Sequence, residues 1–325
     1  MRVDDIIRPL RLPLEDFSAM TVTAPDAGSH PDVAPDVTDG PVLLACDSAP
    51  TASEALCNAG RLAASVMGGP LQVLGICERT PGVAAGMDVL PVPAGLDEAR
   101  RVAMVDDVQR AIAVAAAGDP SWPVEVVLGP PARTLAAEAA RRHASMIVMG
   151  IGRHNPLDRL FGTETTLATL RESRVPVLAV GLGFPAVPQH AVVGMDFSAA
   201  SVQAAQLAAR LIAPEGRLTL VHVRPRFEHP STDWQLWDAD YGRTLPPLFD
   251  QLRVQLDVPN TMLVEMVTVR GDPASSLLSY MQQSQAELIA VGTQRHGSLE
   301  RLVVGSVATR VLRASRRGVL AVPAA

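Results

Sequence analysis

Lysine is missing from this sequence, because all 28 of its basic residues are arginine. A Walker A loop places a lysine on the nucleotide phosphates, so the absence of lysine excludes a P-loop NTPase. Schiff-base chemistry through a protein lysine is excluded for the same reason. Aromatic residues are also scarce, at 3% of the chain.

Cysteine and long apolar runs are lacking as well. The three cysteines, Cys46, Cys57 and Cys77, form no CxxC pair. An odd number without metal-ligand spacing indicates reduced thiols rather than a disulfide framework. No apolar run approaches the roughly 18 to 20 residues of a membrane helix, and the N-terminus lacks the apolar segment of a signal peptide. We therefore expect a soluble, cytoplasmic protein that does not contact membranes.

Basic charge is in deficit, since the net charge is −6. A nucleic-acid partner usually requires a basic face, so we expect none here. Hydrophobic residues make up 48% of the 325 positions, which is enough to build buried cores. This length is typical of two domains.

The first 40 residues have a different composition from the rest. They are rich in Pro, Asp, Ala, Thr and Ser and show little periodicity. Such a stretch buries too little apolar surface to offset its ordering entropy. We interpret residues 1–40 as a flexible leader, with a short helical piece near residues 4–10.

Short apolar runs alternate with helical patterns from residue 41 onward. In the first half the runs are 41–46, 71–77, 124–128, 146–150 and 175–180, and the helical stretches are 51–67, 96–117, 134–143 and 165–172. The pattern restarts with runs at 191–195, 218–223, 263–269, 288–291 and 319–322, and with helices at 201–212 and 245–256. This alternation is typical of buried parallel strands joined by helical crossovers.

The two halves are copies of one unit. Gly129 and Gly271 are 142 positions apart, and the same offset pairs Arg159 with Arg301. It also aligns the Val-Leu-Ala-Val strands at 177–180 and 319–322, with no gap across the intervening residues. A repeat at a fixed offset indicates a duplicated structural unit. The sequence predicts domains at 41–183 and 191–325, joined by a linker at 184–190.

Ligands of an open parallel sheet bind beyond the carboxyl ends of its strands. In the second half, Asp196 follows the first strand, Val223 ends the second and Gly271 follows the third. Gly292 follows the fourth, where a glycine lets a ligand approach the backbone closely. The pair Gly305–Ser306 opens the last helix, whose free backbone N–H groups and dipole favour phosphate.

These motifs resemble the universal stress protein family. The resemblance rests on Asp-x-Ser at 196–198, on Gly-x-Pro-Ala at 271–274 and 129–132, and on the stretch from Gly292 to Val307 before the final helix and strand. It covers residues 41–325 as two repeats. It implies two tandem doubly wound α/β domains, adenine-nucleotide α-hydrolase-like, each with a five-stranded parallel sheet of strand order 3-2-1-4-5.

The resemblance implies a site for ATP or a related adenine nucleotide, with Mg²⁺ when the nucleotide is bound. The second-half residues assigned to it are Asp196, Val223, Gly271, Gly292, Arg295, Gly305, Ser306 and Val307. The corresponding first-half residues are Asp47, Gly129, Gly150, Arg153, Gly162 and Thr163. The second half is the better candidate of the two.

This chain departs from the family's ATP-binding pattern of Gly, two residues, Gly, nine residues and Gly-Ser or Gly-Thr. Arg295 and Arg153 replace the middle glycine, and their guanidinium groups either bind phosphate or fill the cleft. Glu164 aligns with Ser306 and would place a carboxylate where phosphate should lie. A one-residue slip, in which Gly162–Thr163 opens the helix, would avoid this clash.

Structural interpretations remain open beside the functional ones. Asp47 and Asp196 could cap the helices that follow them, and Gly129 and Gly271 could be turn glycines only. Trp234, Trp237 and Tyr241 are spaced for one helical face, and we interpret them as packing residues rather than a stacking platform. We interpret the cysteines as small buried hydrophobes. We expect His154 and His296 to be exposed side chains without a catalytic role.

We expect a regulator rather than an enzyme. The sequence has no GxSxG or HExxH, and no GxGxxG follows its first strand. Any ATPase activity would be slow and incidental. In the family the fifth strand commonly pairs with its copy in a partner, so the halves should form an intrachain pseudo-dimer, with a homodimer and an unidentified protein partner as further expectations. The alternative is a scaffold of the same fold whose degenerate clefts bind no nucleotide.

Overall fold

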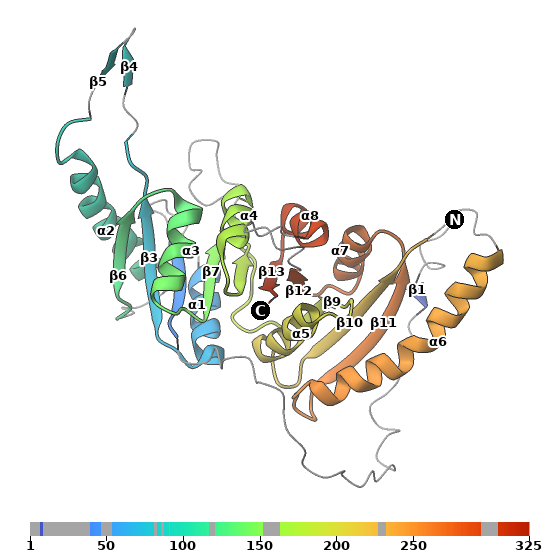
Figure 1. Cartoon of the computed structure of the whole chain (residues 1–325). Helices are drawn as coiled ribbons and strands as arrows, with labels where there is room; N and C mark the ends of the chain where they lie inside the picture. Colours follow the sequence, from blue (N-terminus) through green and yellow to red (C-terminus); the bar gives the residue numbers. More distant parts are fainter. Residues whose placement is uncertain are drawn as a thin grey trace, which may run out of the picture.

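The computed structural model describes most of the two halves. The described residues are 7–8, 40–46, 54–80, 83–85, 88–90, 92–116, 121–151, 163–226, 232–293 and 305–324. Within them the chain alternates strands with helices, as the apolar runs predict (Figure 1).

The first half contains β2 (Val42–Cys46), α1 (Glu54–Met67), β3 (Leu71–Cys77), β4 (Val83–Ala85), β5 (Asp88–Leu90), α2 (Leu96–Ala115), β6 (Val124–Leu128), α3 (Pro131–Arg141), β7 (Met146–Gly150), α4 (Thr163–Glu172) and β8 (Val177–Val180). The second half contains β9 (His190–Gly194), α5 (Ala199–Leu211), β10 (Arg217–Arg224), α6 (Thr232–Gln255), β11 (Leu263–Arg270), α7 (Pro273–Gln283), β12 (Leu288–Thr293), α8 (Ser306–Ala314) and β13 (Gly318–Pro323).

Eleven described strands form one continuous sheet in the order β1-β11-β10-β9-β12-β13-β8-β7-β2-β3-β6. Numbered within its own half, each set of five parallel strands has the order 3-2-1-4-5, so the predicted fold class is confirmed. The strands are apolar on both faces because helices cover both faces of a doubly wound sheet.

Two layers of helices cover the sheet, and each layer has its own core. On one face, α1, α2, α5 and α6 pack through residues such as Ala63, Val108, Ala204 and Leu252. On the other face, α3, α4, α7 and α8 contribute the residues Leu135, Leu167, Leu277 and Val311. Each core includes strand residues from both halves, so neither core stops at the boundary between them.

The fifth strands join the halves, as the sequence predicts. β8 and β13 pair antiparallel, with Leu178 opposite Leu320 at the centre of the register. Leu178 and Leu320 are each 0% exposed. An apolar edge strand is prone to aggregation unless it is covered, and here each fifth strand covers the other.

Three local features differ from the sequence-based expectations or extend them. Ile7–Arg8 forms a strand, β1, that pairs antiparallel with β11, so a helical piece at these residues is wrong. α6 begins at Thr232 rather than at residue 245. Pro246 and Pro247 therefore lie inside the helix. The hairpin of β4 and β5 has no counterpart in the predicted pattern and projects away from the sheet (Figure 1).

The seam between the halves should be sensitive to lost apolar volume. We expect Leu320→Ala to lower the free energy of unfolding by about 2–5 kcal/mol, because the cavity forms in a fully buried strand pair. Leu263 lies on β11 and is 40% exposed. Leu263→Ala should therefore lower the free energy of unfolding by less than about 1 kcal/mol. Urea unfolding followed by circular dichroism measures both, and equal losses would contradict the buried seam.

Candidate functional site

The second-half site lies at the carboxyl edge of β9, β10, β11 and β12. β9 is the central strand, hydrogen-bonded to β10 on one side and β12 on the other. α5 leaves this edge on one face of the sheet, whereas α7 and α8 lie on the other face. The strand order therefore reverses at β9, which is where ligands bind in open α/β sheets.

Asp196 shapes the turn after β9. The Ser198 backbone N–H and hydroxyl donate hydrogen bonds to its Oδ1 at 3.0 and 2.5 Å, while Phe197 between them has a φ of 62°. Burial raises the pKa of Asp196, but hydrogen bonds, led by those from Ser198 and joined by one from Ser201, outweigh it and lower the pKa below its ordinary value. The N-cap of α5 is Ser198, which accepts from Ser201 N–H, so the capping interpretation of Asp196 is wrong.

His222 on β10 is hydrogen-bonded to the backbone just before this turn. Its Nδ1 lies 2.8 Å from the Met195 carbonyl, and its Nε2 lies 2.9 Å from the Tyr241 hydroxyl. A carbonyl only accepts, so Nδ1 carries the proton and Nε2 accepts from Tyr241. Burial lowers the pKa of His222, which keeps this tautomer neutral. The Phe197 ring packs on His222 at a centroid distance of 5.2 Å.

An ion-pair cluster ties α6 to the ends of β10 and β11. Asp238 forms salt bridges with Arg224 and Arg270. Arg224 is buried and also lies over the Tyr241 ring, 5.5 Å from its centroid. Burial raises the pKa of Asp238, but hydrogen bonds and charge from the two arginines outweigh it and lower the pKa. Sequence reasoning missed this cluster, because its members come from three elements with no shared motif.

The three aromatic residues of α6 stack on one another. The Trp237 ring lies 4.5 Å from the Trp234 ring and 5.1 Å from the Tyr241 ring, measured between centroids. Trp237 is nevertheless 47% exposed, so the rings stack on one another at the surface, and the expectation that they pack rather than form a stacking platform is not confirmed.

Gly271 and Gly129 have structural reasons to be glycine. Their φ angles are 150° and 159°. A Cβ on Gly271 would lie 2.7 Å from the Ser276 hydroxyl oxygen, and one on Gly129 would lie 2.3 Å from that of Thr134. Both copies of the repeat therefore need glycine for the same tight turn into a helix.

Asp272, one residue further along, links the start of α7 to α8. It caps α7 by accepting from Ser275 N–H at 3.0 Å, and Arg310 of α8 donates to its other oxygen at 2.7 Å. The hydrogen bond from Arg310 leads the causes that lower the pKa of Asp272 to about 2. A capping aspartate before Pro273 is a signal that the sequence does carry.

Gly292 lies inside β12 and serves packing. A Cβ there would lie 2.6 Å from the Ala200 carbonyl carbon and from the Ser201 backbone nitrogen. The close neighbour is therefore α5, which differs from the expectation that glycine here admits a ligand. Gly150, its first-half equivalent, would bring a Cβ within 4 Å of no described atom.

Among the described residues, nothing covers the start of α8. Gly305 is its N-cap residue, with an ordinary φ of −53°, and no described side chain caps the helix. A Cβ on Gly305 would meet no described atom within 4 Å, so neither the backbone nor the packing visible there requires glycine. Ser306 is exposed and Val307 is partly buried. The first backbone N–H groups of α8 have no intrahelical partner.

Val223, partly buried in β10, pairs with Val269 of β11.

The first turn of the first-half helix carries a charged side chain. α4 is described from Thr163 to Glu172, and the residues before it, 152–162, lie outside the described residues, as does any one-residue slip at Gly162. Glu164 in its first turn accepts hydrogen bonds from Arg313 of α8 at 3.1 and 3.3 Å. Asp47, Arg153, Gly162 and Arg295 lie outside the described residues, as do His154 and His296.

The cysteines are all buried, as predicted. Burial raises the pKa of the Cys57 thiol, which disfavours the reactive thiolate. Within the described part of the chain, no helix is long and apolar enough to cross a bilayer. That part also holds no cluster of three or more His, Cys, Asp or Glu suited to a metal ion.

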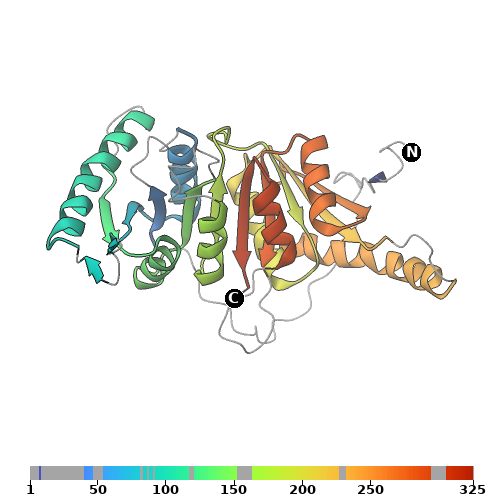
Figure 2. The ribbon, with the colours of Figure 1, turned by 90° about the horizontal axis from the view of Figure 1, so that it is seen from above.

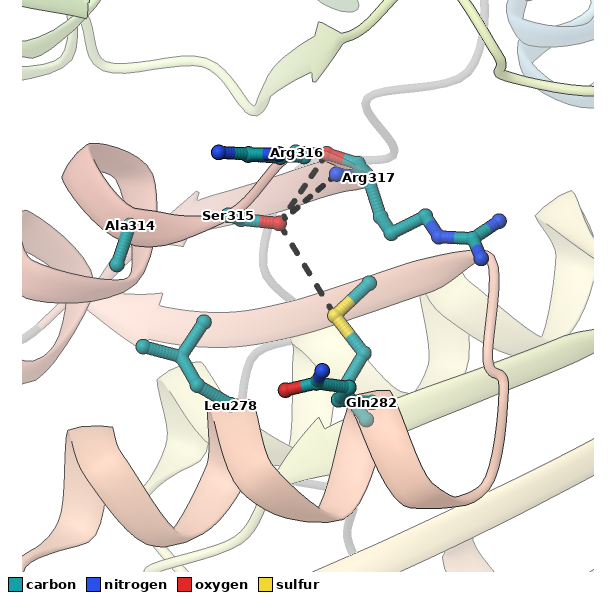
Figure 3. Close-up of a pocket in the computed structure, with 7 residues that line it drawn as sticks. Leu278, Gln282, Ala314, Ser315, Arg316 and Arg317 are labelled. Atoms are coloured by element: carbon teal, nitrogen blue, oxygen red, sulfur yellow. Dashed lines mark hydrogen bonds between the residues drawn. The ribbon is translucent and has the colours of Figure 1, made fainter.

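A pocket of about 480 Å³ lies at the opposite, amino edge of the second half (Figure 3). It is lined by Leu278, Met281, Gln282, Ala314, Ser315, Arg316 and Arg317. These residues belong to the carboxyl ends of α7 and α8 and to the turn before β13. The pocket is therefore distinct from the site at the start of α8.

Comparison with known families matches the chain twice. The universal stress protein family model matches residues 40–181 and again residues 188–323. No curated protein matches the sequence.

Solved structures share the fold along most of the chain. A Pseudomonas aeruginosa PAO1 protein of unknown function is 14% identical with a TM-score of 0.56, covering 89% of this chain and 94% of its own. A universal stress protein from Archaeoglobus fulgidus DSM 4304 is 18% identical with a TM-score of 0.54, covering 87% and 96%.

Two buried histidines should make the fold sensitive to mild acid. Burial lowers the pKa of both His190 and His222, so the unfolded chain takes up protons below about pH 6.5 that the folded chain refuses. Stability should therefore fall as the pH drops from about 7.5 to about 5.5. Urea unfolding at both pH values should show a smaller fall for His222→Phe than for the unmodified protein, and identical falls would contradict the neutral His222.

Proposed function

This chain belongs to the universal stress protein family, and on that premise we propose that it is a stress-response regulator that binds ATP or a related adenine nucleotide at the carboxyl edge of its second half. The observation that carries the proposal is the open start of α8. Its uncapped N–H groups and the positive end of its dipole are suited to phosphate oxygens.

The residues around α8 fit the phosphate chain of a nucleotide. Glycine at position 305 leaves free the space that a Cβ would fill beside these N–H groups. Ser306 adds an exposed hydroxyl at the first position of the helix. Arg310 is already paired with Asp272, so its charge is largely balanced before any ligand arrives. A Mg²⁺ ion would enter on the phosphates of the nucleotide rather than through a dedicated protein cluster.

The nucleoside would occupy the edge formed by β9 and β10. Asp196 presents an ionised carboxylate there, held by Ser198, which suits hydrogen-bond donors on a ribose or an adenine. The backbone at Val223 and Arg224 ends the neighbouring strand. Gly271 closes the next turn along the edge, where its role is to shape the loop.

The first half is the weaker candidate in this proposal. Glu164 already places a carboxylate in the first turn of α4, bound by Arg313. A phosphate at that helix start would have to displace this ion pair or lie against a like charge. We therefore propose one nucleotide per chain.

The proposed regulator acts through nucleotide occupancy rather than turnover. Its setting would be the cytoplasm, where the buried cysteines stay reduced, and its effect would pass to an unidentified protein partner. The rival function is a scaffold of the same fold without nucleotide. One observation favours this rival: Gly292, a glycine of the nucleotide pattern, is explained by packing against α5.

Isothermal titration with ATP separates the two functions. We expect the unmodified protein to bind and Ser306→Glu to lose at least about tenfold in affinity, because the new carboxylate repels phosphate. Gln283→Glu adds the same charge on the exposed far end of α7 and should leave the affinity unchanged. Absence of heat with the unmodified protein would favour the scaffold, and equal affinity in Ser306→Glu would remove the proposed phosphate site.

A further inference from the structure

One ion pair crosses from the second half to the helix start of the first. Arg313, in the last turn of α8, donates to Glu164, in the first turn of α4, with nitrogen–oxygen distances of 3.1 and 3.3 Å. Both side chains are largely exposed, so the pair adds little to stability. Its value here is geometric, because it shows that an arginine of one half reaches the amino end of the opposite helix.

The duplication gives this contact a counterpart related by pseudo-twofold symmetry. The 142-residue offset converts Leu178 into Leu320, and these two residues face each other across the seam. It likewise converts the pair Val177–Ala321 into Val319–Ala179, which is also present. The strand register is therefore symmetric about the Leu178–Leu320 pair. α4 and α8, which flank this seam on the same face, are related by the same symmetry (Figure 2).

The symmetry-related counterpart of the pair Arg313 and Glu164 is the pair Arg171 and Ser306. Arg171 occupies the last turn of α4, as Arg313 does in α8. Position 306, however, carries serine where the first half carries glutamate. Arg171 is exposed and forms no ion pair with any described residue. The repeat thus keeps the arginine and removes the carboxylate that would neutralise it.

We propose that Arg171 of the first half binds the phosphates of a nucleotide held at the start of α8, so that the site is built by both halves. This inference rests on the proposed function and adds to it a ligand-binding residue from the other repeat. A guanidinium suits phosphate because it donates two parallel hydrogen bonds and is always charged. In the first half, the Glu164 carboxylate stands in for that anion on Arg313. Among the described residues, the α4 start therefore carries a paired carboxylate, whereas the α8 start carries a serine.

Cross-linking tests the geometry without any nucleotide. We expect a short bismaleimide to link Arg171→Cys/Ser306→Cys as efficiently as Glu164→Cys/Arg313→Cys, because the two pairs are related by the pseudo-twofold symmetry of the repeat. Arg171→Cys/Gln283→Cys should not link, since Gln283 ends α7 at the opposite edge. The native cysteines are buried and give a low background. Failure of the first pair while the second links would overturn the proposal.

Titration tests the role. With ATP and with inorganic tripolyphosphate as probes, Arg171→Ala should weaken binding by about tenfold or more. Arg317→Ala, which removes an exposed arginine at the amino edge, should bind like the unmodified protein. Unchanged affinity in Arg171→Ala, with binding intact in the unmodified protein, would overturn this inference alone. No binding by the unmodified protein would overturn the nucleotide function and this inference together.

Discussion

The antiparallel pairing of β8 with β13 is the constraint on which the rest of the structure depends. It converts two five-stranded sheets into one sheet and buries two apolar edges that would otherwise be open to other chains. It also sets the directions of the halves, so that the amino end of each fifth strand lies beside the carboxyl end of the other. Residues at the end of α8 therefore reach the beginning of α4.

The two carboxyl edges differ in their side chains although the halves share one strand order. Gly129 and Gly271 make the same turn for the same steric reason, and both helices that follow begin with proline in the first turn. The differences lie where side chains meet charge. The α4 start carries a glutamate bound by an arginine, whereas the α8 start carries a serine and no side-chain cap from any described residue. In our proposal, this difference in side chains decides which helix start attracts an anion.

Much of the fold could be predicted because buried parallel strands leave a strong local signal. The ten core strands and the constant offset follow from short apolar runs and their repetition, whereas the fifth-strand pairing was implied by the family resemblance. The start of α6 could not be predicted in this way. Pro246 and Pro247 are residues typical of a helix start, whereas the helix begins upstream, where Asp238 forms salt bridges with two arginines distant in sequence. The role of Gly292 was also hidden, because the α5 backbone that presses on it is remote in sequence. Tertiary contacts of this kind leave no periodic signal.

The central claim is that one sheet built from two copies holds a single nucleotide, at the open helix start of the second copy. A crystal structure of the protein grown with ATP and Mg²⁺ tests this claim most directly. We expect phosphate density against the backbone N–H groups of Ser306 and Val307, with the Glu164–Arg313 pair intact at the other helix start. Phosphate density at Thr163, or two filled edges per chain, would contradict it.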